Sequence, residues 1–437
     1  MKRLLEFFLT AIIFSIILVS GLNFEVAQAS TEVVGIINAD TTWTKENSPY
    51  TLTGPIFVNN DITLTIEPGV VVNLNGYLLQ VNGTLVARGS SIDSIQLNEG
   101  RITFLYSTAW NEQDNSGTII ENTILNSVHM DIRSSSIKIN NNMINGGFIQ
   151  SHIEGSDTDL YLAHETLTAI ISNNHIIGGS HSSVIEALNT DVIFNNTIIC
   201  TQNQRRGINA QYYSSVISNT ITGLRGYGII GGKNVSGNVV SGFEVGIEAG
   251  YAMVANNLVF NNTYGIEIGG LGSIVQNNTI SNNTIGVYSA QGYFNYNNFE
   301  NNSKYNIYAS SSKSDVNATY NWWGTTDTVL IDQKIYDNND DFRLGKVDYM
   351  PFLTAVNTQA APDSNPLTPT LGASPSPTSP SPSTSPSQCP ITTPQASSTQ
   401  TGVLFGLDWM KTAIIILSLM VILLVVVTMF LRKRKAK

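Results

Sequence analysis

The chain is poor in the residues that usually cross-link or interrupt a globular domain. Its 437 residues include only two cysteines, Cys200 and Cys389, which are too few for a disulfide framework. No proline occurs between Pro68 and Pro351. Because proline removes a ladder hydrogen bond, so long a stretch without it is typical of strands that are paired on both edges. These absences exclude a small disulfide-stabilised scaffold and favour an extended β-structure.

Positive charge is also scarce. Lysine and arginine total 22 against 32 aspartates and glutamates, which gives a formal net charge of −10 at pH 7. Binding of nucleic acid depends on lysine and arginine at the phosphates, so the composition argues against a nucleic-acid partner. An acidic exterior is compatible with cations, with neutral glycans, or simply with solubility.

The amino-terminal end has the features of a secretory signal. A short basic start is followed by an apolar run over residues 7–22, and Ala27-Gln28-Ala29 offers a small-x-small cleavage pattern. An uncleaved membrane helix is the alternative, but the apolar run is short for that purpose. We therefore expect residues 1–29 to be a signal peptide.

The carboxy-terminal end predicts a stalk and a membrane anchor. Residues 359–408 are rich in proline, serine and threonine and cannot bury enough apolar surface to fold, which predicts a disordered stalk. Residues 409–431 contain a charge-free run long enough to cross a bilayer, and residues 432–437 form a basic cluster that stays on the cytoplasmic side. The predicted localisation is a single-pass cell-membrane protein with its bulk outside the cell.

Between these ends the sequence repeats. Asparagine recurs from Asn122 to Asn321 at spacings of 19 to 23 residues, apart from one interval of 32. A second series of glycines, each followed by isoleucine or valine, runs in phase with it from Gly207 to Gly286. Leucine-rich repeats share this period, but their leucine frame is missing, and helical repeats need longer units. The sequence therefore predicts an all-β parallel β-helix, a solenoid of turns of about 20–23 residues.

The repeated residue types have a physical explanation in such a fold. Stacked turns place each residue next to its own copy, so asparagine can form a ladder of amide hydrogen bonds along the stack. Asparagine and glycine also tolerate positive φ, which a sharp bend requires, so we expect both series to occupy bends. The residues predicted to form these structural ladders are Asn196, Asn219, Asn238, Asn257, Asn278, Asn298, Asn321, Gly246, Gly265 and Gly286.

The ends of the repeat and one long interval differ from the rest. Residues 30–100 are expected to form an amino-terminal cap and the first turns, residues 101–324 the β-helix repeats, and residues 325–358 a carboxy-terminal cap. Trp322 and Trp323 are expected to cover the end of the core. The interval of 32 residues contains an insertion at residues 151–167, and insertions in solenoids become loops on one face.

Eight Asn-x-Ser/Thr sequons are candidates for glycosylation in an exported chain. Most ladder asparagines are not sequons, so glycosylation does not explain the repeat. The candidates are Asn82, Asn195, Asn234, Asn261, Asn277, Asn282, Asn301 and Asn317.

These segments resemble a known family. The Asn-Asn-Thr-Ile and Gly-Ile units are similar to the right-handed parallel β-helix repeat of pectate-lyase-like and NosD-like proteins. The segments LTIEPGVVVNLNGYLLQVNGTLVARGS and YNWWGTTD resemble prokaryotic, especially archaeal, cell-surface β-helix proteins. The resemblance covers about residues 33–353 and implies a right-handed β-helix. Because that fold carries lyases, hydrolases, epimerases and non-enzymatic surface proteins, it implies no single activity.

A few charged residues in the repeats are candidates for catalysis on such a fold. The repeats contain no adjacent aspartates and no Gly-His-Gly, so a pectin-type hydrolase is not indicated. A lyase or epimerase needs a basic residue beside the abstracted proton and carboxylates for Ca²⁺. The candidates, with isolated surface charges as the alternative, are Arg205, Arg206, Arg225, Glu248 and Glu267.

Metal sites have little support in the sequence. The five histidines show no metal-binding spacing. Asp337, Asp340 and Asp341 form an acidic loop that could hold Ca²⁺ through oxygen ligands, with a purely structural loop as the alternative. Ca²⁺ is therefore the one cofactor that the sequence suggests.

Two functions remain open from the sequence. The first is a membrane-anchored, non-enzymatic surface module for display, adhesion or glycan binding, whose partners would be extracellular polysaccharide or surface-layer proteins. The second is a Ca²⁺-dependent polysaccharide lyase or epimerase acting on an extracellular glycan.

Overall fold

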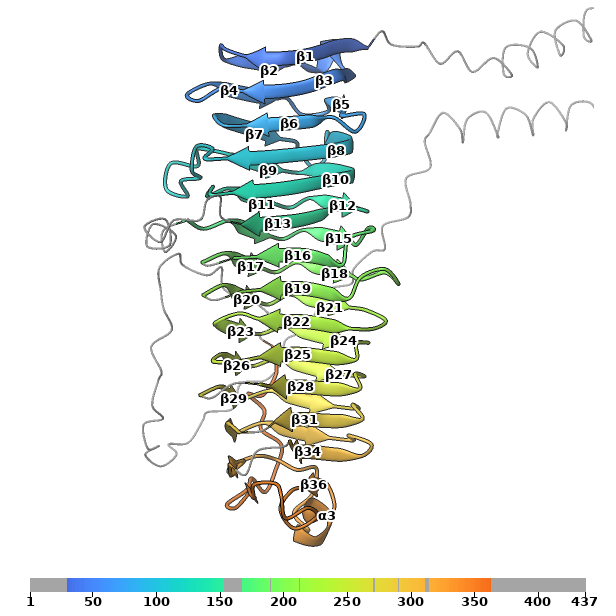
Figure 1. The fold of residues 1–437 in the computed structure, drawn as a ribbon, viewed down its shortest axis with the longest axis vertical. Helices are drawn as coiled ribbons and strands as arrows, with labels where there is room; N and C mark the ends of the chain where they lie inside the picture. Colours follow the sequence, from blue (N-terminus) through green and yellow to red (C-terminus); the bar gives the residue numbers. More distant parts are fainter. Residues whose placement is uncertain are drawn as a thin grey trace, which may run out of the picture. The chain divides into compact units, whose positions relative to one another are not determined.

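The structure is a computed structural model, and it describes residues 30–362 except 153–166, 189, 212, 270–271, 290 and 311–313. These residues form an all-β parallel solenoid of about 13 turns with about 21 residues per turn (Figure 1). The predicted fold class is confirmed to this extent. The predicted signal peptide, membrane helix and basic tail lie outside the described residues, and so does the predicted stalk apart from residues 359–362. Within the described part of the chain, no helix has the length and apolar character needed to span a membrane.

One sheet has 14 strands, each contributed by one turn and paired in parallel with the next. Its strands are β2 (Thr41–Trp43), β4 (Thr63–Ile66), β7 (Thr84–Arg88), β9 (Ile119–Glu121), β11 (Lys138–Asn140), β14 (Ile170–Ser172), β17 (Val192–Phe194), β20 (Ser215–Ile217), β23 (Asn234–Ser236), β26 (Met253–Ala255), β29 (Ile274–Gln276), β32 (Tyr293–Asn295), β35 (Val316–Asn317) and β37 (Val347–Asp348).

The second sheet has 23 strands and wraps around the remaining sides of the solenoid. In its first turns the strands are β1 (Thr31–Ile37), β3 (Tyr50–Val58), β5 (Val71–Asn73), β6 (Leu78–Val81), β8 (Ile95–Leu105) and β10 (Thr123–Arg133). From β12 to β34 each turn contributes two strands to this sheet, a short one and then a longer one, and the last turn contributes β36 alone.

We call the column of shorter strands the short flank. It contains β12 (Met143–Asn145), β15 (His175–Ile177), β18 (Thr197–Ile199), β21 (Thr220–Thr222), β24 (Val239–Ser241), β27 (Leu258–Phe260), β30 (Thr279–Ser281) and β33 (Asn298–Glu300). The long flank contains β13 (Phe148–His152), β16 (Ser183–Ala187), β19 (Arg206–Ala210), β22 (Tyr227–Gly231), β25 (Val245–Ala249), β28 (Tyr264–Ile268), β31 (Ile285–Ser289), β34 (Tyr305–Ala309) and β36 (Ile335–Tyr336).

The core lies inside the turns and runs along the whole solenoid. Each short strand points its central residue inward, and Ile198, Ile221, Val240, Val259 and Ile280 follow one another in register with no exposed surface. Each such aliphatic side chain contributes about 1.5–3 kcal/mol on burial. Cys200 is a free, buried thiol beside this core, and burial raises its pKa to about 12.

A buried asparagine ladder joins the turns at the bend before the short flank. The Nδ2 group of each asparagine donates to the Oδ1 atom of the asparagine in the next turn, at 2.9–3.1 Å. The same Oδ1 atom also accepts from the preceding asparagine's backbone N–H. We call this column the first ladder; its members are Asn142, Asn174, Asn196, Asn219, Asn238, Asn257, Asn278, Asn297 and Asn321.

Two details of the predicted ladder are wrong. The hydrogen bonds pass through Asn297 and not through the predicted Asn298, because Tyr296 takes the bend position in that turn. Positive φ belongs to the residue before each ladder asparagine, for example Asn195 and Asn256, and not to the ladder residue itself. Asn122 also occupies this preceding position, with a φ of 50°. The ladder amides are therefore selected for hydrogen bonding, and their predecessors for the bend.

The glycine series does not form a bend either. Gly246, Gly265 and Gly286 lie inside strands of the long flank and are not in the positive-φ region. A Cβ atom on Gly265 would lie 2.5 Å from the backbone oxygen of Gly286 and 2.9 Å from Nδ2 of Asn283. Glycine is required there because the neighbouring turn and a ladder amide approach too closely for any side chain.

That amide belongs to a second asparagine ladder at the bend between the short and long flanks. Nδ2 of Asn262 donates to Oδ1 of Asn283, and Nδ2 of Asn283 donates to Oδ1 of Asn302, both at 3.2 Å. Asn302 donates in turn to Oδ1 of Asn306, which occupies the position of the glycines in the last turn. The second ladder and the glycine series are thus one packing unit.

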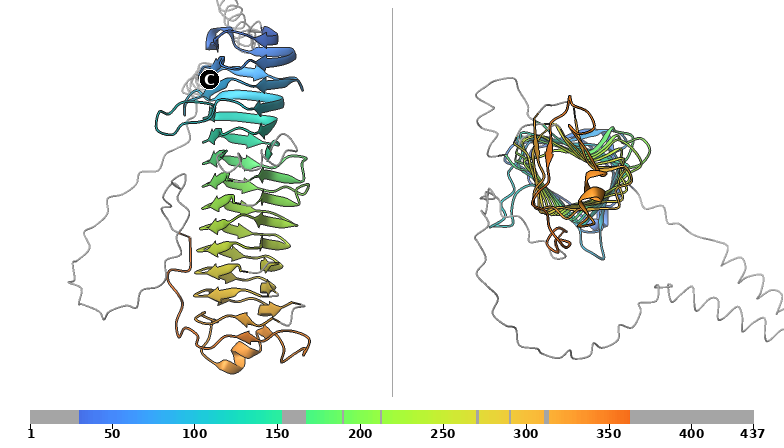
Figure 2. Two further views of the ribbon diagram at one scale, coloured as in Figure 1. Left: turned by 60° about the vertical axis from the view of Figure 1, so that its left-hand side comes forward. Right: turned by 90° about the horizontal axis from the view of Figure 1, so that it is seen from below.

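The two ends of the solenoid differ. At the carboxy-terminal end, helix α3 (Thr328–Asp332) crosses the end of the ring (Figure 2, right), and its Ile331 is fully buried. Trp323 is 3% exposed and stacks on Phe299 at 4.9 Å, while Trp322 is half-buried. At the other end, the 3₁₀ helix η1 (Lys45–Asn47) has no buried residue, and β1 pairs only with β3 among the described strands.

After the last turn, the chain returns along the bend that carries the first ladder. Asn357 donates through Nδ2 to Oδ1 of Asn277, at 3.0 Å, and its backbone N–H donates to Oδ1 of Asn298, at 2.8 Å. Asn256 donates to the carbonyl of Gln359, one turn further back. Residues 354–360 are therefore part of the folded unit.

Candidate functional site

A column of outward side chains runs in register along the long flank. Strand pairing places Glu248, Glu267, Tyr288, Tyr308 and Tyr336 in direct register across β25, β28, β31, β34 and β36. All five are half-buried, because neighbouring strands cover their stems while their ends reach solvent. We call this column the glutamate–tyrosine strip.

The tyrosines of the strip stack on one another. The ring centroids of Tyr288 and Tyr308 are 5.5 Å apart, and those of Tyr308 and Tyr336 are 4.5 Å apart with nearly parallel planes. Tyr264 and Tyr305 pack beside the stack from the neighbouring outward column. Since the ring faces are used within the stack, the strip offers solvent its ring edges and phenol groups.

The other end of the strip is acidic. Partial burial, followed by the nearby charge of Glu248, raises the pKa of Glu267. Partial burial also raises the pKa of Tyr227, and the charges of Glu248, Glu267 and Glu244 add to this effect, while Arg206 opposes it. Tyr227 therefore lies between the carboxylates and Arg206 and is a member of the cluster that the sequence did not indicate.

The three candidate arginines are placed differently. Arg206 is half-buried in β19 and occupies the same outward column as Tyr227. Arg205 and Arg225 are exposed at the bends before β19 and β22. By strand spacing, the Cα atoms of Arg206 and Glu248 are separated by about 10 Å along the column and about 10 Å across it. Among the described residues, no ion pair within 4 Å joins these arginines to Glu248 or Glu267.

The carboxylates of the acidic loop near the carboxy-terminal end accept hydrogen bonds from neighbouring groups of the same chain. Asp337 is 3% exposed and accepts from the backbone N–H groups of Asn339 and Val347, at 2.8 and 2.9 Å. Asp340 accepts from the backbone of Asp337. Hydrogen bonds from Arg343 lower the pKa of Asp341 to about 2. Within the described ranges, no group of three or more metal-ligating side chains is positioned to hold an ion.

The candidate sequons fall into two groups. Five of their asparagines are exposed, namely Asn195, Asn261, Asn282, Asn301 and Asn317. The other three, Asn82, Asn234 and Asn277, are half-buried. The returning segment holds the Asn277 side chain, so this sequon is the least accessible of them.

A groove that sequence patterns do not indicate lies on the 14-stranded sheet. The loop at residues 106–117 overhangs β11, β14 and β17 and encloses a volume of about 1130 Å³. Trp110 holds this loop in place: its indole N–H donates to Glu112, and the Lys138 ammonium lies 5.0 Å from its ring centroid. Burial alone would raise the pKa of Glu112, but the hydrogen bonds from Lys138 and Trp110 lower it. The loop lies before the asparagine series begins at Asn122, which is why periodicity does not reveal it.

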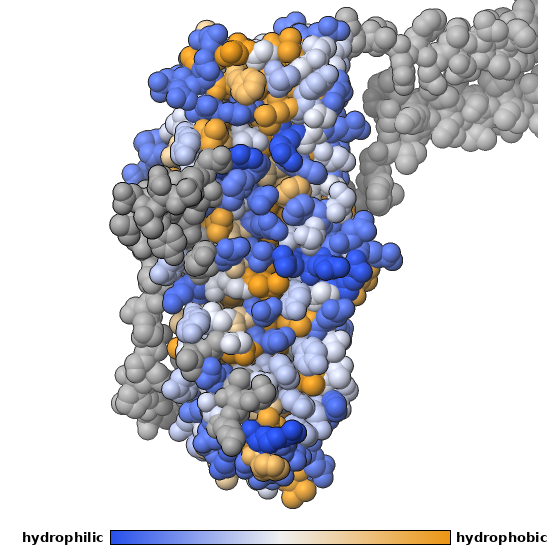
Figure 3. Space-filling model, viewed as in Figure 1, coloured by the Kyte–Doolittle hydropathy of each residue, from blue (hydrophilic) through white to orange (hydrophobic). Residues whose placement is uncertain are grey.

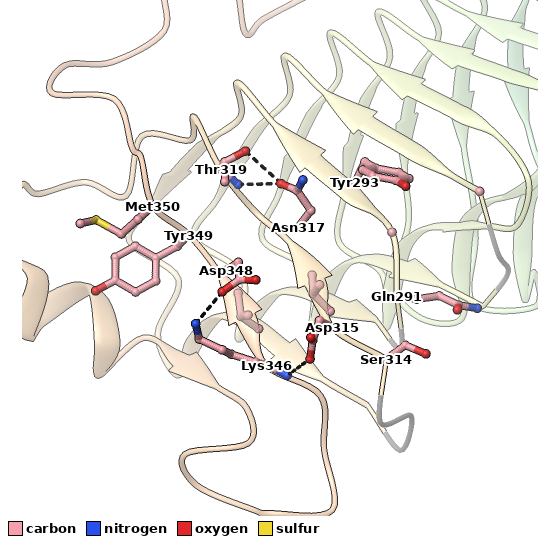
Figure 4. Close-up of a pocket in the computed structure, with 14 residues that line it drawn as sticks. Gln291, Tyr293, Ser314, Asp315, Asn317, Thr319, Lys346, Asp348, Tyr349 and Met350 are labelled. Carbon is pink, nitrogen blue, oxygen red and sulfur yellow. Dashed lines mark hydrogen bonds and ion pairs between the residues drawn. The ribbon is translucent and has the colours of Figure 1, made fainter.

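A second groove lies at the carboxy-terminal end of the same sheet and has a volume of about 740 Å³. Figure 4 shows Tyr293, Asn317 and Asp348 on neighbouring turns along it, with Lys346 paired to Asp348 at 2.7 Å. Asn317 accepts from the hydroxyl of Thr319. The polar side chains of this groove thus form hydrogen bonds and ion pairs chiefly with one another.

The insertion predicted at residues 151–167 lies outside the described residues, apart from its ends. Buried Asp191 stands beside it and accepts from the backbone N–H groups of Ala169 and Leu188, at 2.8 and 3.0 Å. Burial raises the pKa of Asp191 to about 6, against the effect of these bonds and of one from Ser151. Asp191 therefore ties together the chain on both sides of the insertion.

Comparisons with known proteins are limited to the fold. No protein-family model matches the chain, and no curated protein matches it. Two solved structures are similar, both mutants of the periplasmic alginate epimerase AlgG. The double mutant has a TM-score of 0.38 and 13% identity over 69% of this chain and 77% of that one. The single mutant has a TM-score of 0.35 and 12% identity over 69% and 75%.

Proposed function

We propose that this chain is a cell-surface protein whose right-handed β-helix binds extracellular glycans without modifying them. A signal peptide would export it, and the stalk and carboxy-terminal helix would hold the solenoid outside the membrane. The sequence of the two ends supports this topology, since each end has the composition of a targeting or anchoring segment.

The glutamate–tyrosine strip is the observation that carries the proposal. It runs in register through five successive strands, so its polar ends recur at about 4.8 Å, the spacing of the strands. A linear glycan lying along the solenoid would meet a phenol or carboxylate in every turn. Tyrosine suits this role because it combines apolar contact area with a hydrogen-bonding tip.

The absence of a charge pair on this strip favours binding over catalysis. Proton abstraction next to a carbonyl requires a base within hydrogen-bonding reach and a cation that stabilises the developing charge. The described arginines form no ion pair with the strip carboxylates. Uncompensated carboxylates instead favour neutral or amino-substituted sugars over uronates.

The test is a glycan array probed with the full-length chain in detergent micelles. We expect selective binding that falls at least tenfold in a Tyr288→Ser/Tyr308→Ser double variant. Tyr106→Ser is the matched control, because Tyr106 is 58% exposed and lies outside the strip. Equal losses in both variants, or turnover of any bound glycan, would contradict the proposal.

A second function, a Ca²⁺-dependent lyase or epimerase, is favoured by one observation. Partial burial and then the charges of Glu248 and Glu267 raise the pKa of Tyr227, and the charge of Arg206 opposes them, so these groups lie near one another. Release of an ultraviolet-absorbing unsaturated product from a polyuronate, dependent on Ca²⁺ and lost in Arg206→Ala, would support it. Binding without product in the presence of Ca²⁺ would support the first function instead.

A further inference from the structure

The amino-terminal end of the solenoid has an open sheet edge. Strand β1 is seven residues long, and within the described chain it forms a ladder with β3 alone. Its neighbour β2 likewise pairs only with β4. β1 contains neither proline nor lysine, the residues that commonly protect such an edge from pairing.

Apolar side chains surround this open edge. Val34 is 63% exposed and Ile36 is 61% exposed, and Phe57, the register partner of Ile36, is 36% exposed. Figure 3 shows apolar surface gathered over these first turns. Inward-facing Val33 and Ile37 are only partly buried, so the end of the core also reaches the surface here.

The opposite end shows how this chain closes an edge. Its last strands, β36 and β37, have two residues each, and the end of the core is covered by helix α3 and Trp323. The Asp341–Arg343 ion pair adds charge beside β36. Short strands, a covering helix and charge are the usual ways to prevent edge pairing. β1, in contrast, has seven residues and a single charge, Glu32, and the nearby 3₁₀ helix η1 buries no residue.

We propose that β1 pairs with β1 of a second copy of this chain, in an antiparallel, two-fold arrangement that joins two solenoids end to end. A second copy offers a strand of equal length and an equally apolar surround. The charge on the strand fits this geometry. Centred on Val34, the arrangement places Glu32, the one charged residue of β1, opposite Ile36 and not opposite its own copy. The proposal does not depend on glycan binding.

Cysteine cross-linking tests this pairing in the full-length chain. In a Cys389→Ser background, single cysteines are placed at Glu32, Val34 and Ile36, and the membranes are oxidised. The arrangement centred on Val34 brings this residue face to face with its own copy. We therefore expect Val34→Cys to form a disulfide-linked dimer, and Glu32→Cys and Ile36→Cys to form less of it. Leu224→Cys is the matched control, because Leu224 is 66% exposed and lies in a later turn.

A second variant separates pairing from folding. Ile36→Glu changes only an outward side chain, so the thermal midpoint should stay within a few degrees of that of the parent. In the arrangement centred on Val34 this glutamate faces Glu32 of the second copy, and like charges directly opposite each other weaken pairing. Cross-linking through Val34→Cys should therefore fall at least fivefold when Ile36→Glu is added. The proposal is overturned if Val34→Cys does not exceed the Leu224→Cys control, or if Ile36→Glu leaves the cross-linking unchanged.

Discussion

The first ladder and the glutamate–tyrosine strip both run along the solenoid, but they keep their residue types to different degrees. In the ladder the same asparagine recurs through nine turns, because each amide bonds to the amide before and after it. In the strip the residue changes from glutamate to tyrosine along the column. The residue type in the ladder is constant because each asparagine hydrogen-bonds to its neighbours. The residue type in the strip can change because its side chains face solvent. Repetition in this chain therefore marks its construction, and variation within a repeated position marks the surface available for function.

The largest expected effect comes from breaking the ladder in its middle. Asn238→Ala removes the Nδ2 group that donates to the backbone oxygens of Val216 and Ser236 and to Oδ1 of Asn257. These acceptors then lose that hydrogen bond inside the solenoid. We expect a loss of about 3–5 kcal/mol of unfolding free energy, measured by chemical denaturation. Asn256→Gly is the control, because it keeps the positive φ of the neighbouring bend. An equal loss in both variants would contradict the assignment of this stability to the ladder hydrogen bonds.

A smaller effect is expected where the second ladder meets the glycine series. Gly265→Ala would place a methyl group 2.5 Å from a backbone oxygen of the next turn, which the strand must shift to accommodate. A loss of about 2 kcal/mol follows from such overpacking. Gly269→Ala, with no atom within 4 Å of the new methyl group, should change the thermal midpoint by no more than a degree or two. Similar shifts in the two variants would contradict this explanation of the glycines.

The smallest effect is expected on the strip. The pKa of Glu267 is raised in the folded state, so its ionised form opposes folding and stability falls as pH rises through that pKa. Glu267→Gln should therefore stabilise the solenoid by less than about 1 kcal/mol at pH 7 and by nothing at pH 3. Thermal unfolding at both values measures this difference, with Glu300→Gln on the short flank as the control. If Glu267→Gln were instead less stable than the parent, the strip, like the ladder, would be a structural column.

The sequence predicted the solenoid because its repetition is local and counted along the chain. The spacing of Asn238, Asn257 and Asn278 determines the turns directly. The error at Asn298 arose where two adjacent asparagines were equally compatible with the count, and only the bend at Tyr296 distinguishes them. The prediction that the glycines form a bend was wrong. Glycine can be required because it tolerates positive φ or because it has no side chain, and at these positions the second reason applies.

The candidate sites were harder to predict because they depend on which residues face outward in register. Arg206 and the two glutamates were found as charges, but Tyr227 was not, since one tyrosine among many carries no signal of its own. The groove under Trp110 was missed for a related reason. Its floor comes from three turns and its wall from a loop outside the repeat, so no single stretch of sequence describes it.

The alignment of successive turns also limits what can be attached to them. Asn261, Asn282 and Asn301 stand on one bend in consecutive turns, each with positive φ and an exposed side chain. Their separation is one strand spacing, about 4.8 Å, which is no wider than a single sugar ring. An oligosaccharide on Asn282 would therefore occupy the space above both neighbours. The three sites would compete as they are modified, and the coat along this edge would be set by crowding as much as by sequence.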